Sequence, residues 1–537
     1  MVDPMRQDMN SVNGHEIPSS LSAAAPSPEE VGWWKIPGSP PDAARFSQSC
    51  EELFLSRNGV LGLQRILETL AVHQDEALLS LSGAILVLRH SVRYDIVDLL
   101  LKNVLRLLPD NVVAHCFTAH LCIVRGGLAE GCAHFATLMS RYPGQRIEIG
   151  EFVSMSLLEV GYPAEALNVT MSLLRAGDVS VSLLNNAGCA LERLNRSTQA
   201  LALYEQALKI NPHSQEVAFG YACSLIKAGQ FARGWPVYFN RALQVSTWQE
   251  SLRGRQRLRP ESDLAGKRVL LFQEQGLGDT LQFIRHASVL VERGAEVSVH
   301  VPGSISRLIS LSCDNLTVLE PKVMPDLDRF DYVAPIPDLP YLTGMCAVQD
   351  IPVNVPYLRA SGEDIARFEA CLPPGRPRIG LVWAGERRGR SEFALADMRR
   401  SISFDDMVAA LLPIEADIVN LQFGAARDAL KDWRGQSIAD PMGDVSDMAD
   451  TAAIMQNLDL VISVDTSPVH LAGALGRPVW LISRWDACWR WGDEGQGSPW
   501  YPTMRIFRSQ ERSFGPVLQE VGKALRLWVA MWRPRKT

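Results

Sequence analysis

The sequence predicts a multidomain protein in which an α-helical superhelix is followed by an α/β module of two parallel-sheet domains. The first observation is a 34-residue repeat between about residues 45 and 246. The second is a change, after about residue 266, to short β-branched runs that alternate with helical segments in two sets. The third is length, because 537 residues exceed what one hydrophobic core normally serves.

The composition is that of an ordinary globular protein, with 47% hydrophobic and 21% charged residues. A net charge of −7, without a basic stripe carrying interleaved aromatic residues, argues against nucleic acid as a partner. No stretch reaches the ~18 continuous apolar residues that a transmembrane helix needs, and no signal peptide is recognisable, so we expect a cytoplasmic protein. The ten cysteines are scattered without a C-x-x-C pair, which argues against a zinc site and a disulfide framework.

Two segments without a sustained period flank the repeat region. Residues 1–44 are rich in Pro, Ser and Ala, which is typical of a disordered leader. Residues 247–265 are rich in Arg, Gln and Ser, and we expect them to form a linker.

Residues 45–246 repeat with a countable period. Positions where one helix should turn into the next are 34 residues apart, as are large apolar positions: Gly127, Gly161, Asn195 and Gly229, and Leu157, Leu191 and Leu225. Small residues recur where two helices must approach closely, such as Gly188, Ala200 and Ala207. The pattern resembles a tetratricopeptide repeat array. Such arrays stack into a superhelix whose groove binds a peptide or protein, although an array can also merely brace the next domain.

The remainder reads as two α/β domains. The first, 266–372, contains the strand candidates RVLLF, EVSVHV, LTVLE and DYVAPI. After a break near Pro373–Pro377, the second domain, 373–537, contains RIGLVWAG, DIVNLQF, LDLVISV and RPVWLIS. Alternation of strands and helices predicts parallel sheets, with a ligand cleft between the two domains at the carboxyl ends of the strands.

The stretch FQEQGLGDTLQF, 272–283, lies between the first strand and a helix. Gly276 and Gly278 fit part of a dinucleotide-binding fingerprint, but Leu281 replaces the third glycine. The second strand ends without an acidic residue, and no Lys-Ser/Thr pair follows the turn, which argues against NAD and against a Walker loop. Asp279 at this helix start is either an N-cap or a carboxylate held in place as a general base.

The second domain carries the most informative stretch, LDLVISVDTSPVHLAGALGRPVW. A hydrophobic strand ends in Asp465-Thr466-Ser467, and a helix should begin near Pro468. The free N–H groups and the positive end of that helix can bind a diphosphate, and Asp465 can accept a hydrogen bond from a ribose hydroxyl. His470 would face the cleft one turn into the helix, although a histidine at such a position can also be purely structural.

At these residues the sequence resembles the heptosyltransferase-like bacterial glycosyltransferases. The matched pattern is an Asp-Thr pair followed by His-x-Ala-x-Ala-x-Gly-x-Pro, here Asp465, Thr466, His470, Ala472, Ala474, Gly476 and Pro478. The turn Gly278-Asp279-Thr280 resembles the family's Gly-Asp turn. Fusions of tetratricopeptide repeats to such a transferase share further stretches, among them EQGLGDTLQF, VWAG, DMRRS, LQFG and SPWYPTMRIFR.

The resemblance implies a GT-B fold, two Rossmann-like domains with a final helix, 516–532, that crosses back to the first domain. It implies an inverting glycosyltransferase that needs no metal and no cofactor besides the nucleotide-sugar co-substrate. The second domain would hold the donor, and Asp279 would be the catalytic base. Some fusions of this type glycosylate flagellin, so the repeats would present a protein acceptor. The sequence has no D-x-D pair placed at a strand end, which agrees with the absence of a metal.

Further candidates lie next to other strand ends. On the acceptor side of the cleft these are Gly276, Gly278, Thr280 and Gln282. On the donor side they are Trp383, Gly385 and Gln422, with Arg400 and Ser401 as phosphate contacts. Arg400 can equally lie on the solvated surface. The tryptophans at 480, 485, 489, 491 and 500 are explained mainly by core packing, with one or two rings available to stack on a base or sugar.

The alternative function is a scaffold that retains a sugar-nucleotide fold without catalysis while the repeats bind partners. The presence of both Asp279 and the motif from Asp465 to His470 favours the enzyme.

Overall fold

The computed structural model describes residues 41–55, 59–73, 75–243, 251–252, 254–386 and 394–533. The predicted leader therefore lies outside the described residues up to residue 40, and helix α1 begins at Pro41. Within the described residues the chain forms two compact units, the first covering 41–220 and 394–399 and the second covering 221–386 and 400–533.

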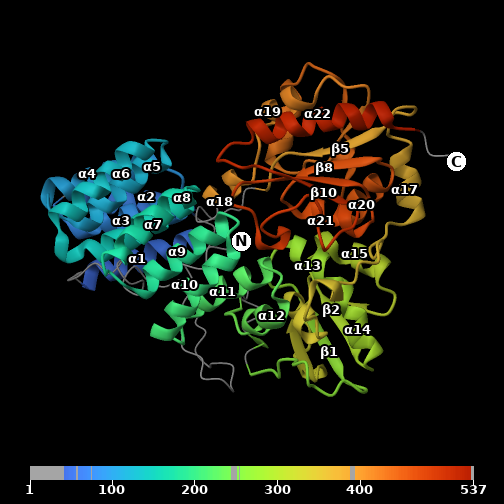
Figure 1. The fold of residues 1–537 in the computed structure, drawn as a ribbon, viewed down its shortest axis with the longest axis horizontal. Helices are drawn as coiled ribbons and strands as arrows, with labels where there is room; N and C mark the ends of the chain where they lie inside the picture. The colour runs from blue at the N-terminus through green and yellow to red at the C-terminus, as the bar shows by residue number, and fades with distance from the viewer. Residues whose placement is uncertain are drawn as a thin grey trace. The chain divides into compact units, whose positions relative to one another are not determined.

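The first unit is a stack of antiparallel helix pairs (Figure 1). Its helices are α1 Pro41–Leu55, α2 Gly59–Val72, α3 Ala77–His90, α4 Tyr94–Leu107, α5 Val112–Val124, α6 Leu128–Arg141, α7 Arg146–Val160, α8 Pro163–Arg175, α9 Val181–Arg193 and α10 Ser197–Ile210. The pairs share one continuous apolar core, as expected for repeats that cannot bury their apolar faces alone. The helical superhelix predicted from the period is confirmed.

The 34-residue steps have a backbone cause. Gly161, Asn195 and Gly229 all adopt a positive φ, of 95°, 58° and 75°, where one helix ends and the next begins. Asn195 is the single non-glycine residue with a positive φ in the described part of the chain, and asparagine tolerates this conformation better than most residues. At the first step the turn falls one residue earlier, because Gly126 has the positive φ and Gly127 is the N-cap of α6.

Close helix packing explains the small residues of the best repeat. A Cβ added to Gly188 on α9 would lie 2.8 Å from the ring of Tyr204 on α10, and one added to Gly220 would lie 2.8 Å from the same ring. Ala200 and Ala207 are fully buried on the same helix as Tyr204. A short helix much later in the chain, α18 Ala394–Arg399, also belongs to this unit, where Arg399 donates to the carbonyl of Glu159 on α7.

The second unit begins within α11 Gln215–Lys227 and continues with α12 Phe231–Phe239. Its first sheet is parallel in the order β3-β2-β1-β4, with β1 Arg268–Phe272, β2 Glu296–His300, β3 Thr317–Val318 and β4 Tyr332–Pro335. The helices of this part are α13 Leu277–Phe283, α14 Ala287–Glu292, α15 Gly303–Ser312 and α16 Leu339–Leu342. The last helix pair of the predicted repeat array is therefore grouped with the α/β domains.

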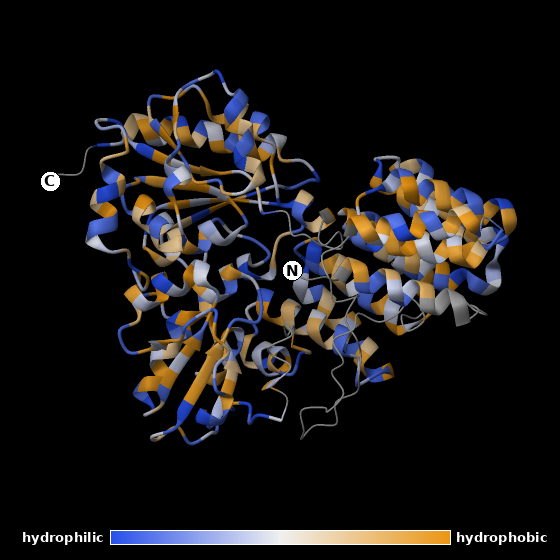
Figure 2. Ribbon diagram, turned by 180° about the vertical axis from the view of Figure 1, so that it is seen from behind, coloured by the Kyte–Doolittle hydropathy of each residue, from blue (hydrophilic) through white to orange (hydrophobic). Residues whose placement is uncertain are grey.

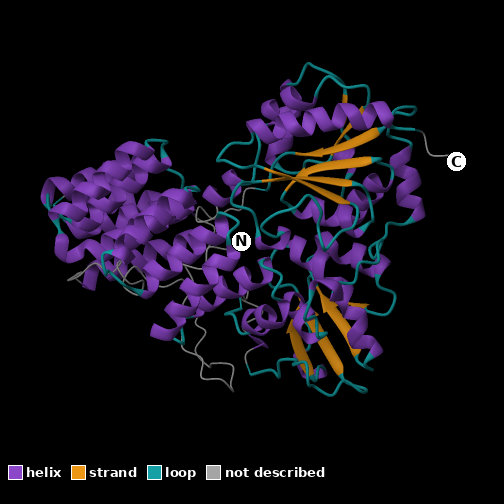
Figure 3. Ribbon diagram, viewed as in Figure 1, coloured by secondary structure: helices purple, strands orange, loops and turns teal. Residues whose placement is uncertain are grey.

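The second sheet is also parallel, in the order β10-β9-β8-β5-β6-β7. Figure 3 shows the strands of the two sheets in orange. Its strands are β5 Arg378–Val382, β6 Asp417–Asn420, β7 Ile438–Ala439, β8 Leu460–Val464, β9 Val479–Ser483 and β10 Met504–Arg508. Helices α17 Gly362–Glu369, α19 Phe404–Leu411, α20 Met448–Gln456, α21 Ser467–Ala474 and α22 Gly515–Met531 complete this part. The central strands are hydrophobic along their length (Figure 2), and β8 and β9 are buried at every residue.

Two predicted boundaries differ from the structure. The final helix α22 packs against α19 and β10 of the second sheet instead of crossing back to the first domain. The reason is its buried stripe, Val517, Leu518, Val521 and Leu525, which joins the core under that sheet. Helix α17, expected in the first domain, packs against α20 of the second. None of the helices within the described ranges is long and apolar enough to cross a membrane.

Candidate functional site

The glycine turn joins β1 to α13, and its glycine Gly276 is the N-cap of that helix, with φ −66° and ψ 164°. Asp279 is therefore the third helical residue and not the cap, so the N-cap interpretation of Asp279 was wrong. An acidic side chain in the first turn still favours the helix, because it faces the positive end of the helix dipole.

Asp279 forms an ion pair with Arg490, a residue that follows it by 211 positions. Both side chains are largely buried, with exposed fractions of 13% for Asp279 and 9% for Arg490. Arg490 also donates to the sulfur of Cys488 at 3.1 Å, and its guanidinium lies over the ring of Trp489 at 4.2 Å. The ion pair therefore links α13 to the segment that follows β9.

Gly278 lies against His470 of the second domain. A Cβ added at Gly278 would lie 2.8 Å from Cδ2 and 3.2 Å from Nε2 of His470. The absence of a side chain at this position therefore permits close contact between α13 and α21. The two motifs singled out from the sequence meet at this contact.

We expect Gly278→Ala to lower the free energy of unfolding by about 1–3 kcal/mol, because the new methyl group overlaps the buried ring of His470, which is held by Tyr501 and Trp491. Urea denaturation followed by tryptophan fluorescence measures the change. The matched control is Gly362→Ala at the start of α17, where an added Cβ has nothing within 4 Å. Equal stability of the two variants would contradict the close approach.

Helix α21 starts directly after β8. Its N-cap is Thr466, whose side chain makes no capping hydrogen bond to the first turn. Its hydroxyl is 3.4 Å from the carbonyl oxygen of Val464. Asp465, Thr466, Ser467 and Pro468 are all only partly buried. The start of α21 is therefore a partly open helix N-terminus at the carboxyl edge of the sheet, the arrangement that favours an anion.

His470 lies further along the same helix and is 5% exposed. Its Nδ1 is 3.0 Å from the hydroxyl of Tyr501, and its ring stacks on Trp491 with 5.2 Å between centroids. Burial lowers the pKa of His470 to about 4. The imidazole is therefore neutral at pH 7. It lies between Gly278 of the first domain and Trp491 of the second.

The donor-side residues after β5 form a second group at the same sheet edge, because β5 is the neighbour of β8. The side chain of Gln422 accepts from the backbone N–H groups of Trp383 and Ala384 and donates to the Ala384 carbonyl at 3.0 Å. The N–H of Gly385 donates to the hydroxyl of Ser401 at 3.2 Å. Gln422 and Ser401 thus shape the turn after β5.

Arg400 and Trp383 have different positions relative to this turn. A Cβ at Gly385 would lie 2.5 Å from Nε of Arg400, so this guanidinium lies directly over the turn. Trp383 is buried and packs on Phe404 at 4.9 Å. The structure therefore gives Trp383 a core role.

Two predicted acceptor-side residues, Thr280 and Gln282, are buried with polar atoms that have no partner. The Thr280 hydroxyl and both polar atoms of the Gln282 side chain lack a hydrogen bond among the described residues. Thr280 is 1% exposed and Gln282 is fully buried. Buried polar groups of this kind are normally satisfied by water or by a ligand.

Sequence reasoning missed the cationic partners of this region. Arg490 was not among the predicted site residues, although an arginine between two tryptophans, W-R-W, is a usable signal. Arg285 was not singled out at all, yet it donates to the backbone carbonyls of Trp500 and Pro352 and to the hydroxyl of Tyr357. Arg241 and Glu274 form a buried ion pair at 2.6 Å that no sequence motif predicted.

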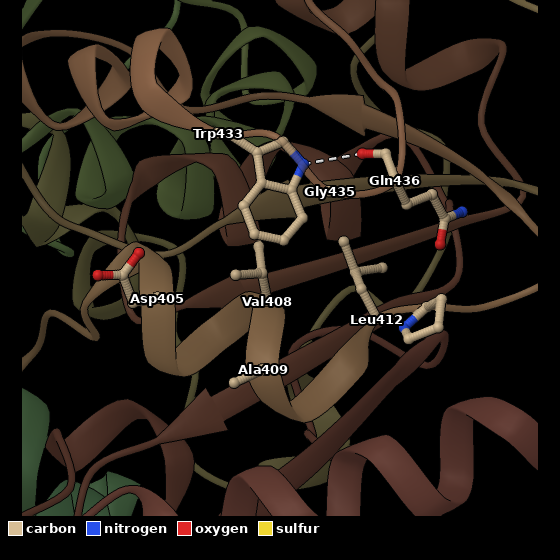
Figure 4. Close-up of a pocket in the computed structure, with 8 residues that line it drawn as sticks. Asp405, Val408, Ala409, Leu412, Trp433, Gly435 and Gln436 are labelled. Atoms are coloured by element: carbon tan, nitrogen blue, oxygen red, sulfur yellow. Dashed lines mark hydrogen bonds between the residues drawn. The ribbon is translucent and has the colours of Figure 1, made fainter.

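A cavity of about 400 Å³ lies elsewhere in the second domain (Figure 4). It is lined by Asp405, Val408, Ala409, Leu412, Pro413, Trp433, Gly435 and Gln436. The indole N–H of Trp433 donates to the backbone carbonyl of Gln436 at 2.8 Å. None of the site residues predicted from sequence contributes to this mainly apolar hollow.

Two segments of the chain match known protein families. Residues 181–214 match the tetratricopeptide repeat model, and residues 445–512 match glycosyltransferase family 9 (heptosyltransferase). Protein FlbA of Caulobacter vibrioides is 28% identical over 395 residues, which are 67% of this chain and 63% of FlbA. The chain thus matches somewhat less than two thirds of that relative's length.

Solved structures are only distantly similar. The ADP-heptose LPS heptosyltransferase II of E. coli is 14% identical over 48% of this chain and 98% of its own, with a TM-score of 0.35. Yeast Tom70 is 14% identical over 36% of this chain and 42% of its own, with a TM-score of 0.31.

The matched segments coincide with the elements described above. The repeat match covers α9 and α10, and the family 9 match contains Asp465, Thr466, Ser467, His470 and Arg490. Along the chain, a segment that matches the tetratricopeptide repeat model is thus followed by one that matches glycosyltransferase family 9.

Proposed function

We propose that the protein transfers a sugar from a nucleotide-sugar donor to a hydroxyl group of a protein or glycan acceptor. The observation that carries the proposal is the contact between Gly278 and His470. It brings the turn with a candidate base next to the helix with a candidate diphosphate site. Supporting it are the half-buried start of α21 and the unpartnered polar groups of α13.

In the proposed reaction the acceptor oxygen attacks the anomeric carbon of the donor. Its proton passes to a carboxylate oxygen of Asp279 as the new C–O bond forms. The bond from the anomeric carbon to the nucleotide diphosphate breaks at the same time, and the configuration inverts. The N–H groups at the start of α21 stabilise the charge on the leaving diphosphate, with Arg400 as an additional cation near the turn after β5.

We assign roles to the remaining candidate residues from their positions in the fold. Asp465 holds a ribose hydroxyl, and Thr466 and Ser467 contribute hydroxyl donors to the diphosphate. The neutral His470 and the turn at Gly385 form the walls of the donor site. The repeats recruit the protein acceptor, with flagellin as the first one to test, and the reaction takes place in the cytoplasm, where nucleotide sugars are available.

A second candidate function is the scaffold without catalysis. The ion pair between Asp279 and Arg490 favours it, because a base that is 13% exposed and already paired must be released or reached by the acceptor. Binding of the donor without any turnover would be its signature.

The test uses the full chain and a panel of UDP-, GDP-, ADP- and CMP-sugars. We expect calorimetry to detect binding of one nucleotide class and chromatography to detect hydrolysis or transfer of its sugar. Activity should be unchanged after treatment with EDTA, because the proposed stabilisation of the leaving group uses N–H donors and cationic side chains alone. Binding without turnover would favour the scaffold, no binding to any donor would contradict both functions, and loss of activity with EDTA would show that a metal takes part.

Acceptor choice is tested separately by intact-mass spectrometry. Flagellin from cells with and without this gene should differ by the mass of one or more sugar residues. Identical masses would exclude flagellin and leave the donor chemistry untouched.

A further inference from the structure

Helix α12 was expected to be the end of the repeat array, yet it packs into the transferase unit. Trp235 on this helix contacts the ring of Phe283 on α13 at 6.0 Å and that of Trp489 at 6.0 Å. Phe231 stacks on Trp500 with 5.9 Å between centroids. The helix therefore contacts both α13, which carries Asp279, and the segment that carries Arg490.

The segment just after α12 is joined to the glycine turn by a buried ion pair of Arg241. Arg241 donates to Glu274 at 2.6 Å, and the exposed fractions of the two side chains are 2% and 0%. The same guanidinium pairs with Asp338 at 2.6 Å and lies over the ring of Tyr238 at 4.3 Å. Glu274 precedes the N-cap Gly276 by two residues, so the ion pair acts directly on the backbone of the turn.

A second bond joins the same two elements. The side-chain amide of Gln275 donates to the hydroxyl of Tyr238 at 2.8 Å. Tyr238 is 1% exposed and lies edge-on against Trp489 at 6.0 Å. Two consecutive turn residues are thus bound by this segment, Gln275 by Tyr238 of α12 and Glu274 by Arg241 just after it.

Stability alone does not account for this arrangement. Placing an arginine and two carboxylates in a buried site has a large desolvation cost, and well-packed apolar residues are often as stable or more stable there. What such a network does provide is a single fixed geometry. The geometry that it fixes is that of residues 274–276, the entry to the helix that presents Asp279.

We infer that Arg241 and Tyr238 are positioning residues for the catalytic turn. The last helix of the repeat array and the residues just after it would then set the geometry of the transferase site. This inference rests on the proposed function, because it gives the turn its purpose. Arg241 and Tyr238 act through Glu274 and Gln275, and neither needs to touch substrate.

The test compares Tyr238→Phe, Arg241→Lys and Arg241→Met in the full chain by hydrogen–deuterium exchange and steady-state kinetics. Tyr238→Phe keeps the ring and removes only the hydroxyl that accepts from Gln275. We expect at least fivefold faster exchange of the amides in 273–279 and about a tenfold fall in kcat, with the KM for the donor unchanged. Arg241→Met should have larger effects on both readouts, and Arg241→Lys should restore part of the loss.

Lys227→Met is the matched control. Lys227 is a fully buried cation on α11 that donates to the Ala487 carbonyl at 2.9 Å, in the second domain. Its loss should lower stability without changing exchange in 273–279. Faster exchange there in Lys227→Met, to the same extent as in the Arg241 variants, would show general loosening and overturn the inference.

Unchanged exchange in Tyr238→Phe would also overturn it, and this variant decides the matter if Arg241→Met does not fold. The exchange measurement needs no substrate. Failure of the proposed function would therefore appear as an absence of donor binding and turnover in the unmodified chain, separately from the outcome for the turn.

Discussion

Asp279→Asn is expected to lower kcat about 10²–10⁴-fold, with donor affinity within about twofold of the unmodified chain. An asparagine amide has nearly the same shape as the carboxylate but cannot take up the proton of the acceptor hydroxyl. Donor binding is assigned to the second domain and should be retained. The measurement is kcat with saturating donor and acceptor, together with calorimetry of donor binding.

The same substitution is expected to lower stability, because it leaves Arg490 largely buried without its anion. The exposed fraction of the Arg490 side chain is 9%, and breaking a buried ion pair by removing one partner typically costs about 3–5 kcal/mol. The Asn carbonyl can still accept one hydrogen bond, so we expect a value near the lower end. Asp279→Asn combined with Arg490→Gln should recover stability without recovering kcat.

This double variant separates catalysis from folding. The surface control is Asp328→Asn, since Asp328 belongs to the same domain and its side chain is 81% exposed. That variant should match the unmodified chain in kcat and stability. Full activity of Asp279→Asn would contradict the assignment of Asp279 as the base, whatever its stability.

The helices and strands that could be predicted are those that depend on local sequence patterns. The strands RVLLF, LDLVISV and RPVWLIS were recognisable because buried parallel strands are continuously hydrophobic, and they form β1, β8 and β9. The repeat was recognisable because each helix end needs a residue that accepts a positive φ, such as Gly161 or Asn195. The positions of the two site motifs followed from a general rule that ligands bind at the carboxyl ends of parallel strands.

The missed part depends on contacts between distant residues. Asp279 meets Arg490 across 211 positions, and Arg241 meets Asp338 across 97, distances at which no period or local motif connects the pair. Strands β7 and β10 were missed because β7 has only two residues and β10, MRIFR, is an edge strand interrupted by arginines. The route of α22 could not be predicted because an amphipathic helix pattern identifies a buried face without identifying the surface that covers it.

The stability of the second unit is expected to fall by about 4 kcal/mol between pH 7 and pH 5, because two of its histidines are buried in the neutral form. Burial lowers the pKa of His470 to about 4 and that of His286 to about 3. For His470 the nearby Asp465 opposes the shift and Arg285 adds to it, and Arg285 also adds to the shift of His286. Both imidazoles resist protonation in the native state at pH 5.

The free energy of unfolding falls with falling pH because the unfolded chain takes up protons. An unfolded histidine has a pKa near 6.5, so between pH 7 and pH 5 it binds a proton that the native state does not bind. Unfolding therefore becomes easier as the pH falls, by ~2 kcal/mol for each histidine at pH 5. This stability is fully present above about pH 6.5 and is lost progressively as the pH falls toward the native pKa values.

Urea denaturation at pH 7 and pH 5, followed by tryptophan fluorescence, measures this loss, since every tryptophan that the structure describes lies in the second unit. His470→Asn places an amide near the Nδ1 that faces Tyr501, and it should lower stability at pH 7 while removing about half of the pH dependence. The control His213→Asn changes an exposed histidine of the first unit and should leave the pH dependence as it was. An unaltered pH dependence in His470→Asn would mean that the imidazole accepts a proton in the folded protein. The group between Gly278 and Trp491 would then be a cation at pH 5 and not a neutral ring.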